Sequence, residues 1–352
     1  MKNKHAGTVL SFVGVGVITL VVAVVLIILV DINAPIDSNV PIGSNVPRAF
    51  SSFITGIFGS LYSISEVVVR ATPLIFAGLG ISVGLRSGFI NIGAEGQLYM
   101  GAIAATAIAL SFSQLPAIII MPMMILGGFL LGGLWALIPG FLKARFGLSE
   151  VISTIMFNYV AINIVGVLVR TVLQDPAHAF PQSAFLPDSA LLSTFFPIAR
   201  VHTGIIIACA CAVLTWLLMW KTPTGFKLRA VGLNSLACKV AGIRVYKHVI
   251  LAAILSGGLA GLAGLNEVAG IHRRFIEGFS PNYGYIAIVV ALLGKSHPVG
   301  VVLAALGIAA LDVGSIAMQR VAGVPSAISL IIKGVLVLLI LGRKYMFRIS
   351  AE

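Results

Sequence analysis

The sequence predicts an all-α fold, a polytopic membrane helix bundle with about ten transmembrane helices. Hydrophobic residues make up 59% of the 352 residues and charged residues only 10%, and the mean hydropathy is +1.09. Apolar runs long enough to cross a bilayer recur along the chain, and the stretches between them reach no more than about thirty residues. Because this leaves no room for a soluble catalytic or nucleotide-binding domain, we expect one transmembrane domain over residues 1–352.

The first expected span is the unbroken apolar run 9–30, which follows Lys2 and Lys4. The run is too long for a cleaved signal peptide and no small-residue cleavage site follows it, so we expect it to stay in the membrane. Polar, proline-containing residues 31–48 then predict an outer loop. Apolar residues recur at helical spacing between Phe50 and Leu61, which predicts an amphipathic helix at the outer interface or leading into the next span.

The remaining expected spans cover residues 67–85, 92–111, 117–141, 150–172, 203–220, 248–269, 283–294, 299–317 and 326–342. The segment 283–294 is the weakest of them, because its length alone does not carry a full crossing. With this arrangement, basic residues favour one side by about two to one, and that side is expected to be the cytoplasm. Both termini are then cytoplasmic.

The formal charge of +12 is explained by basic loops on the cytoplasmic side of a membrane protein. The basic residues are spread over many loops without aromatic residues between them, so we expect no nucleic-acid binding. Cys209 and Cys211 lie two positions apart on an expected helix and face different directions, so no disulfide framework is expected. The sequence also predicts no metal site and no cofactor.

A possible phosphate-binding loop is the sequence GKS at 294–296. That motif requires a glycine five positions before Gly294, and the residue there is Val289. The motif therefore fails, and no arrangement of Ser, His and Asp or of paired cysteines offers another catalytic site. We expect no catalytic residues in this chain, so any ATP hydrolysis must come from another chain.

The segment Ser87–Gln97 reads SGFINIGAEGQ and is polar and glycine-rich between two apolar runs. Its amides and its carboxylate, Asn91, Gln97 and Glu95, need partners near a membrane, and its glycines allow the backbone to leave helical geometry. A broken polar segment between spans is typical of transporter binding sites. Two interpretations of its depth stay open, because Arg86 favours a cytoplasmic turn and the glycines favour a break within the membrane.

A second polar pair, Asn266–Glu267, lies 172 positions after Glu95, about half the chain. Either the two places belong to inverted repeats with broken helices that face each other, or they are independent, polar-capped helix ends. Asn158 is a lone amide within a span, for which an interhelical hydrogen bond and a place on the substrate pathway are both considered. Lys333 lies within the last span and is expected to pair with Asp312.

The longest expected cytoplasmic loop, residues 221–247, carries six basic residues and no acidic one. The positive-inside rule explains this charge but not the amphipathic pattern of residues 229–242. We expect a short helix there, with Asn234 as N-cap and Gly242 as the C-terminal stop. Such a helix, lying parallel to the membrane, is suited to docking a soluble partner.

Six sequence segments in this order cover residues 72–300 and resemble the permease subunits of ABC importers. Within that superfamily, NIGAEGQ resembles the nucleoside-uptake branch, which is related to permeases for ribose-type sugars and branched-chain amino acids. The segments are PLIFAGLG, RSGFINIGAEGQ, KARFGLSEVISTIMFNY, TPTGFKLRAVGLNSLACKVAGI, GLAGLNEVAG and ALLGKSHPVG.

The resemblance implies that helix 229–242 is the coupling helix that docks in the ATPase, with Arg229, Gly232, Asn234, Ala237 and Gly242 in the coupling segment. Many importers have a glutamate where this chain has Leu236, and the resemblance implies that this replacement is common in the nucleoside-uptake branch. The substrate pathway is expected to include Asn91, Glu95, Gln97, Asn158, Asn266 and Glu267.

The resemblance also implies a bacterial cytoplasmic membrane location and a complex with several partners. These are an ABC ATPase subunit, a second and different permease subunit, and an extracellular lipid-anchored substrate-binding protein. The expected function is nucleoside import by alternating access. The alternatives are a permease for a simple sugar or a branched-chain amino acid and, outside the family, an ion-coupled secondary transporter, which has no need of a docking helix.

Overall fold

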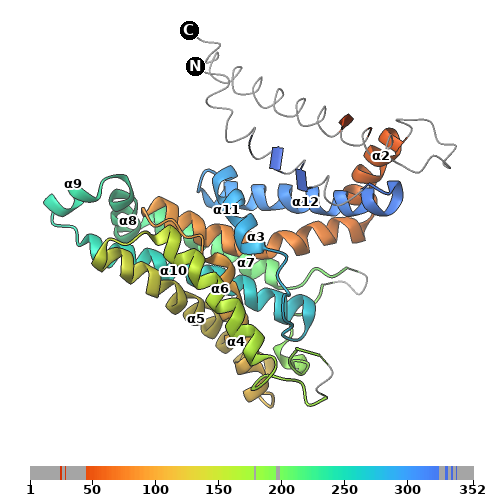
Figure 1. Cartoon of the computed structure of the whole chain (residues 1–352), viewed down its shortest axis with the longest axis horizontal. Coiled ribbons are helices and arrows are strands. Elements are labelled where there is room, and N and C mark those ends of the chain that lie inside the picture. Colours follow the sequence, from red (N-terminus) through yellow and green to blue (C-terminus); the bar gives the residue numbers. More distant parts are fainter. Residues whose placement is uncertain are drawn as a thin grey trace, which may run out of the picture. The chain divides into compact units, whose positions relative to one another are not determined.

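The computed structural model describes residues 45–177, 180–195 and 199–324, with a few isolated positions on either side (24–25, 28, 330–331, 334–335 and 338). The described residues are helical apart from loops and two isolated β-bridges, Gln182 to Ile276 and Thr194 to His202. This confirms the predicted all-α bundle (Figure 1). Most of the expected first and last spans lie outside the described residues, as does Lys333, so its pairing with Asp312 stays a prediction.

The chain divides into two compact units, residues 1–67 with 306–352 and residues 68–305. Each is described by itself, and one domain over residues 1–352 stays a prediction. In the first unit, the amphipathic helix predicted before the second span is α2 (Asn45–Phe58). Its Ala49 forms a small core with Met318 and Val324, against which Phe50 and Phe53 pack.

The second unit contains the remaining helices, and two of them, α3 and α12, continue into the first unit. Eight of the expected spans correspond to helices of the structure, and six helices of the described part are long and apolar enough to cross a membrane. The helices are α3 (Leu61–Arg86), α4 (Ala94–Ser111), α5 (Ala117–Phe146), α6 (Glu150–Leu168), α7 (Gly204–Lys221), α8 (Pro223–Leu233), α9 (Ser235–Val240), α10 (Val245–Asn266), α11 (Tyr283–Leu293) and α12 (Pro298–Ala322). A π-helical turn, η2 (Glu267–His272), extends α10.

The long helices differ in how much of their apolar surface is covered. In the apolar windows of α3 and α10, 89% and 72% of the residues are buried, against 28% for α5 and 22% each for α6 and α7. Exposed leucine, isoleucine and valine side chains on α5, α6 and α7 require an apolar solvent. The helices α5, α6 and α7 therefore lie at the apolar periphery of the unit, whereas α3 and α10 are largely covered by other parts of the chain.

Glycines bring α4, α5 and α10 close together. A Cβ atom added to Gly101 of α4 would lie 2.2 Å from the carbonyl oxygen of Gly261 in α10, and one added to Gly132 of α5 would lie 2.5 Å from that of Gly257. Backbones approach this closely only where neither residue carries a side chain. These glycines therefore allow a close crossing of α4, α5 and α10.

We call the end of the second unit that carries Arg86, Lys143 and the α8–α9 segment the inner end, after the orientation that the sequence predicts. The opposite end, with the loop after α6 and the turn η2, is the outer end. Figure 1 shows α8 and α9 together at the inner end.

Candidate functional site

The link between α3 and α4, residues 87–93, begins with a turn at the inner end. The guanidinium of Arg86 donates to the carbonyl oxygens of Lys295 (2.9 Å) and Ser296 (3.1 Å), which belong to the turn between α11 and α12. Gly88 has a φ of +75°, a backbone conformation that favours glycine, and the ammonium of Lys143 donates to its carbonyl oxygen. Hydrogen bonds therefore connect the start of the link to the inner ends of α5, α11 and α12.

Asn91 then fixes the link from within the bundle. Its side-chain nitrogen donates to Gln97 Oε1 (2.7 Å) and Ser256 Oγ (2.9 Å), and its oxygen accepts from the Gly93 amide (2.9 Å) and Gln97 Nε2 (3.0 Å). The Asn91 and Gln97 side chains are both 1% exposed. Because every polar atom of the Asn91 side chain has a partner, this network stabilises the start of α4.

Asn158 of α6 also binds the α3–α4 link and the start of α4, deeper in the bundle. Its side-chain oxygen accepts from the Gly96 amide (2.8 Å), and its nitrogen donates to the Ile92 carbonyl (2.9 Å) and the Tyr285 hydroxyl (3.1 Å). Asn158 lies two turns into α6 from Glu150, about 12 Å along the helix axis. The two interpretations of the link's depth thus combine, since it turns at the inner end and then enters the bundle.

The N-termini of α4 and α11 meet at Glu95. Its carboxylate accepts from the Gly284 amide at 2.7 Å, and a Cβ on Gly284 would lie 2.2 Å from the Glu95 nitrogen. A carboxylate at a helix N-terminus interacts favourably with the helix dipole. The two helices then diverge, α11 toward the Lys295 turn at the inner end and α4 toward the outer end.

This arrangement gives Glu95 a partner that the sequence did not identify. The segment whose backbone binds the Glu95 carboxylate is the start of α11, 189 positions away. The broken helices of opposite direction are therefore α4 and α11. Asn266 and Glu267 are also no helix end, because the helix continues through them as the π turn η2.

The other two predicted substrate residues, Asn266 and Glu267, lie where α10 passes into the turn η2. Asn266 is fully buried beside Gly204 of α7, and neither its amide nitrogen nor its oxygen has a hydrogen-bond partner among the described residues. Glu267 Oε2 lies 3.5 Å from His272 Nε2. Burial, together with the charge of Arg200, lowers the pKa of nearby His202 to about 4, so His202 is neutral at pH 7.

The segment expected to dock a soluble partner forms two helices, α8 and α9, rather than the single helix expected over 229–242. We call these two helices the docking segment. The chain breaks at Asn234, whose side chain accepts from the Ala237 amide at 3.0 Å and so caps α9. Gly242 follows α9 with a φ of +76°. Both capping predictions are confirmed, but Arg229 and Gly232 belong to α8, because the extended backbone that an N-cap requires interrupts the helix.

Apolar side chains of the docking segment project into solvent. Leu233 is 88% exposed, Leu236 71% and Val240 91%. These residues flank or belong to α9, at the end of the unit that carries the basic loops, where a bilayer does not cover them in the predicted orientation. An exposed apolar group of this kind is typical of a protein interaction site.

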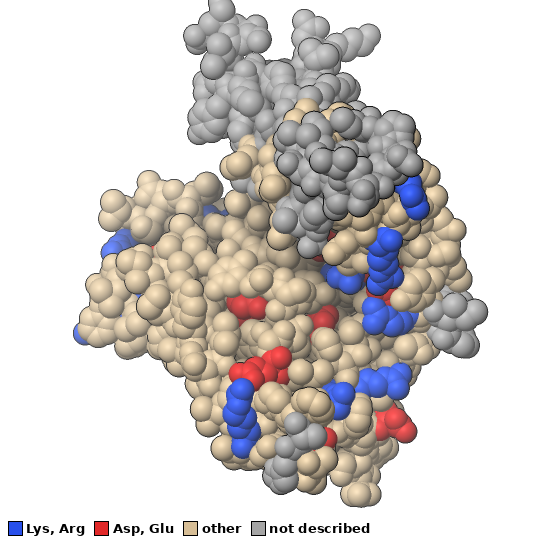
Figure 2. Space-filling model, turned by 45° about the vertical axis from the view of Figure 1, so that its right-hand side comes forward, with Lys and Arg blue, Asp and Glu red and all other residues tan. Residues whose placement is uncertain are grey.

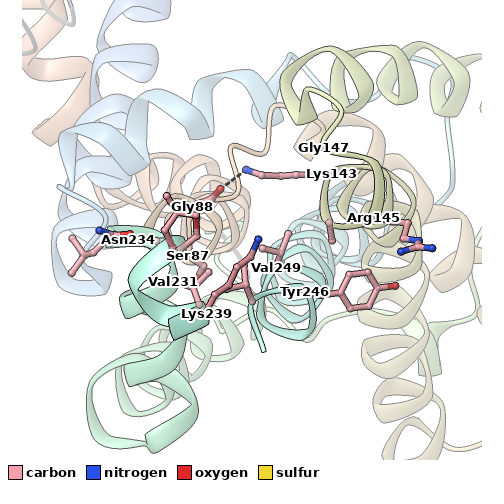
Figure 3. Close-up of a pocket in the computed structure, with 16 residues that line it drawn as sticks. Ser87, Gly88, Lys143, Arg145, Gly147, Val231, Asn234, Lys239, Tyr246 and Val249 are labelled. Atoms are coloured by element: carbon pink, nitrogen blue, oxygen red, sulfur yellow. Dashed lines mark hydrogen bonds between the residues drawn. The ribbon is translucent and has the colours of Figure 1, made fainter. Parts of the chain in front are cut away.

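Gly232 of α8 packs directly on the α3–α4 link. A Cβ atom at Gly232 would lie 2.2 Å from the Arg86 carbonyl oxygen, so no other residue fits without a shift of one backbone. Figure 3 shows the pocket of about 1060 Å³ beside this contact, which is lined by Asn234 and Lys239 of the docking segment and by Lys143 and Arg145 at the end of α5. The docking segment therefore contacts the α3–α4 link.

Sequence reasoning did not identify several partners of the predicted residues, above all Ser256, Gly284 and Tyr285. Each is distant in sequence from the residue that it binds, and none carries a local pattern that marks it. The glycines after Ser256 allow close helix packing, whereas the serine itself binds Asn91.

Residues 63–341 match the protein family described as "Branched-chain amino acid transport system / permease component". This is well over half of the chain, and the chain therefore belongs to this family of ABC transporter permease subunits. It is a multi-pass membrane protein. The resemblance inferred from the sequence motifs is confirmed.

Individual relatives cover most of the chain. The guanosine ABC transporter permease protein NupP of Bacillus subtilis is 39% identical over 295 residues, which is 83% of this chain and 84% of NupP. The nucleoside ABC transporter permease protein NupB of Lactococcus lactis subsp. cremoris is 32% identical, with 82% and 81% covered. The glucose ABC transporter permease protein TsgB13 of Haloferax volcanii is 38% identical, with 82% and 78% covered.

Proposed function

We propose that this chain forms half of the translocation pathway of an ATP-driven importer for nucleosides. The similarity to guanosine and nucleoside permeases supports the substrate class. The chemistry of the bundle agrees with it, since amides, hydroxyls and few charges suit a neutral polar heterocycle with a sugar better than an ion. The proposed pathway residues are Asn91, Glu95, Gln97, Asn158, Asn266 and Glu267.

The coupling of transport to ATP rests on one observation, the contact between the docking segment and the α3–α4 link. An ATPase subunit binds the exposed side chains of α9, chiefly Leu236 and Val240. Because Gly232 of α8 packs on the backbone of Arg86 and Gly88, a displacement of the docking segment on ATP binding moves the link. The link in turn carries the start of α4, so the pathway opens alternately to either side.

The complete importer contains further subunits. A second, different permease supplies the other half of the pathway, and a lipid-anchored binding protein delivers substrate at the outer end. The inner end faces the cytoplasm of a bacterial cell, as do both termini. Of the coupling residues, Asn234, Ala237 and Gly242 fix the shape of α9, while Arg229 and Gly232 belong to the α8 side of the segment.

A simple sugar is the second candidate substrate, and the similarity to a glucose permease favours it. Uptake of labelled guanosine in cells that express the whole importer tests both candidates, with excess unlabelled nucleoside, glucose or leucine as competitors. We expect competition by nucleosides alone. Absence of guanosine uptake, together with uptake of labelled glucose by the same cells, would make a simple sugar the substrate class.

The docking surface is tested in the same cells by Leu236→Asp, with Leu236→Met as its matched control. The aspartate introduces a charge into an apolar contact and is expected to abolish concentrative uptake, as is deletion of the ATPase gene, while the methionine leaves uptake unchanged. Concentrative uptake without the ATPase would contradict the ABC mechanism. Normal uptake by Leu236→Asp would move the docking site elsewhere.

A further inference from the structure

A second pocket, of about 310 Å³, lies at the outer end of the second unit. Its volume is at the lower end of the range for small-molecule sites. Its walls come from α3, the loop before α7, the turn η2 and the segment before α11. The residues that carry the argument are Arg70, Glu267, His272, Phe279 and Tyr283.

The carboxylate of Glu267 lies on a π-helical turn. Such turns are rare, and they are frequently found at functional sites. Here the turn brings Glu267 and His272 to the same pocket, with 3.5 Å between Oε2 and Nε2. His272 neutralises part of the carboxylate's charge when protonated and leaves the other carboxylate oxygen as an acceptor.

One wall of the pocket is aromatic and held rigidly. The ring of Phe279 makes an edge contact with Tyr99, with centroids 4.9 Å apart, and further contacts with Phe275 (5.6 Å) and His272 (5.9 Å). Tyr283 lines the same pocket, and both Phe279 and Tyr283 are 7% exposed. Rings fixed by other rings offer a preformed apolar surface to a flat heterocycle.

Arg70, which lines the pocket, carries a hydrogen-bond donor without a partner among the described residues. The Nε atom of Arg70 is buried and makes no hydrogen bond to any described residue, although a buried polar atom normally has one. Figure 2 shows basic and acidic side chains next to one another on the face it presents. The pocket thus combines an acceptor, a donor and an aromatic wall, which suits a neutral ligand with a flat ring and hydroxyl groups.

We infer that this pocket is the outer binding site for the nucleoside, with the base against Phe279 and the ribose hydroxyls donating to Glu267. The inference rests on the proposed function, because it assigns a place on this chain to the same substrate. It also gives Glu267 a direct contact with substrate. On its inner side, the segment that carries Phe279 and Tyr283 leads to Gly284, which binds Glu95, so the pocket borders the junction of α4 and α11.

The test is guanosine binding to the assembled permease–ATPase complex in lipid nanodiscs without the binding protein, measured by ligand-observed NMR. A hydrogen bond to a charged group contributes enough that Glu267→Gln is expected to weaken guanosine binding about tenfold. On the unmodified complex, 2′,3′-dideoxyguanosine is expected to bind about tenfold more weakly than guanosine. With Glu267→Gln the difference between the two ligands should vanish, because both changes remove the same contact.

Phe279→Leu gives a second, independent readout and is expected to weaken both ligands equally. Phe180→Leu, at an exposed outer-loop phenylalanine outside the pocket, is the matched control and should leave binding unchanged. Additive losses from Glu267→Gln and from removal of the hydroxyls would overturn the inference, as would guanosine binding that Phe279→Leu does not affect. If the complex imports guanosine in an ATP-dependent way but these variants bind it normally, the pocket assignment fails and the proposed function stands.

Discussion

Two polar regions of the bundle, the α3–α4 link and the outer end, differ in how many of their buried polar atoms have hydrogen-bond partners. At the α3–α4 link, all polar atoms of the Asn91 and Asn158 side chains have partners within the chain. At the outer end, both amide atoms of Asn266 and the Nε atom of Arg70 have none among the described residues. A satisfied buried network fixes a conformation, whereas unsatisfied buried groups need a ligand or water. The hydrogen bonds of Asn91 and Asn158 therefore fix the wall of the pathway at the start of α4, whereas the outer end keeps buried polar groups without partners among the described residues.

Asn91→Leu should produce the largest effect on stability. The substitution removes the hydrogen-bond partner of Ser256, Gln97 and the Gly93 amide in the buried interior, and the expected loss is about 3 kcal/mol. Thermal unfolding of the purified complex measures it. An unchanged midpoint would show that the network contributes no stability and would remove one side of the comparison.

Gly232→Ala should uncouple transport from ATP hydrolysis. The added methyl group meets the Arg86 carbonyl oxygen, so α8 and the link have to separate, while the core of the bundle is untouched. We expect an assembled complex whose substrate-stimulated ATPase activity falls about tenfold or more. Gly307→Ala is the control, because a Cβ there meets no atom within 4 Å. Equal activity of both variants would locate the coupling contact elsewhere.

Asn266→Leu should have a small effect on stability, in contrast to Asn91→Leu. No hydrogen bond within the described chain is lost, and an apolar side chain of similar volume replaces an amide whose polar atoms lack partners. We expect a change within about 1 kcal/mol of either sign. A loss as large as that of Asn91→Leu, in the same unfolding experiment, would mean that Asn266 has strong partners after all.

Glu277→Gln should have the smallest effect. Glu277 binds Arg170 through two hydrogen bonds of 2.7 and 3.0 Å and raises the pKa of Arg170, but the pair is exposed and its attraction is screened. We expect no change in the midpoint of unfolding at physiological ionic strength. A clear decrease that high salt abolishes would show that this outer ion pair contributes more than its exposure predicts.

Much of the fold follows from local sequence. Apolar runs located the helices because the bilayer sets their length, and Asn234 and Gly242 predicted the limits of α9 because capping depends on a few neighbouring residues. The break between α8 and α9 was missed, since the amphipathic pattern continues across Asn234 and hides the extended backbone at that position.

The candidate site was predicted in its residues but only in part in its contacts. Polar groups in an apolar chain stand out, which is why Asn91, Glu95 and Glu267 were identified. Their partners Ser256 and Gly284 were not identified, because they lie far away in sequence. Ser256 binds through a hydroxyl and Gly284 through a backbone amide, and neither group marks its residue as distinct from others in the chain. The outer pocket was missed for the same reason, since Phe279 and Tyr283 have the appearance of ordinary apolar residues before a helix.

The comparison between the two polar regions is tested most directly by the structure of the complete importer with guanosine bound, determined by electron cryomicroscopy. The account predicts density for the nucleoside in the outer pocket, with its ring beside Phe279 and its ribose beside Glu267. It also predicts that Asn91 and Asn158 keep their present partners. Density for the nucleoside between Asn91, Gln97 and Asn158, with their mutual hydrogen bonds broken, would contradict the account.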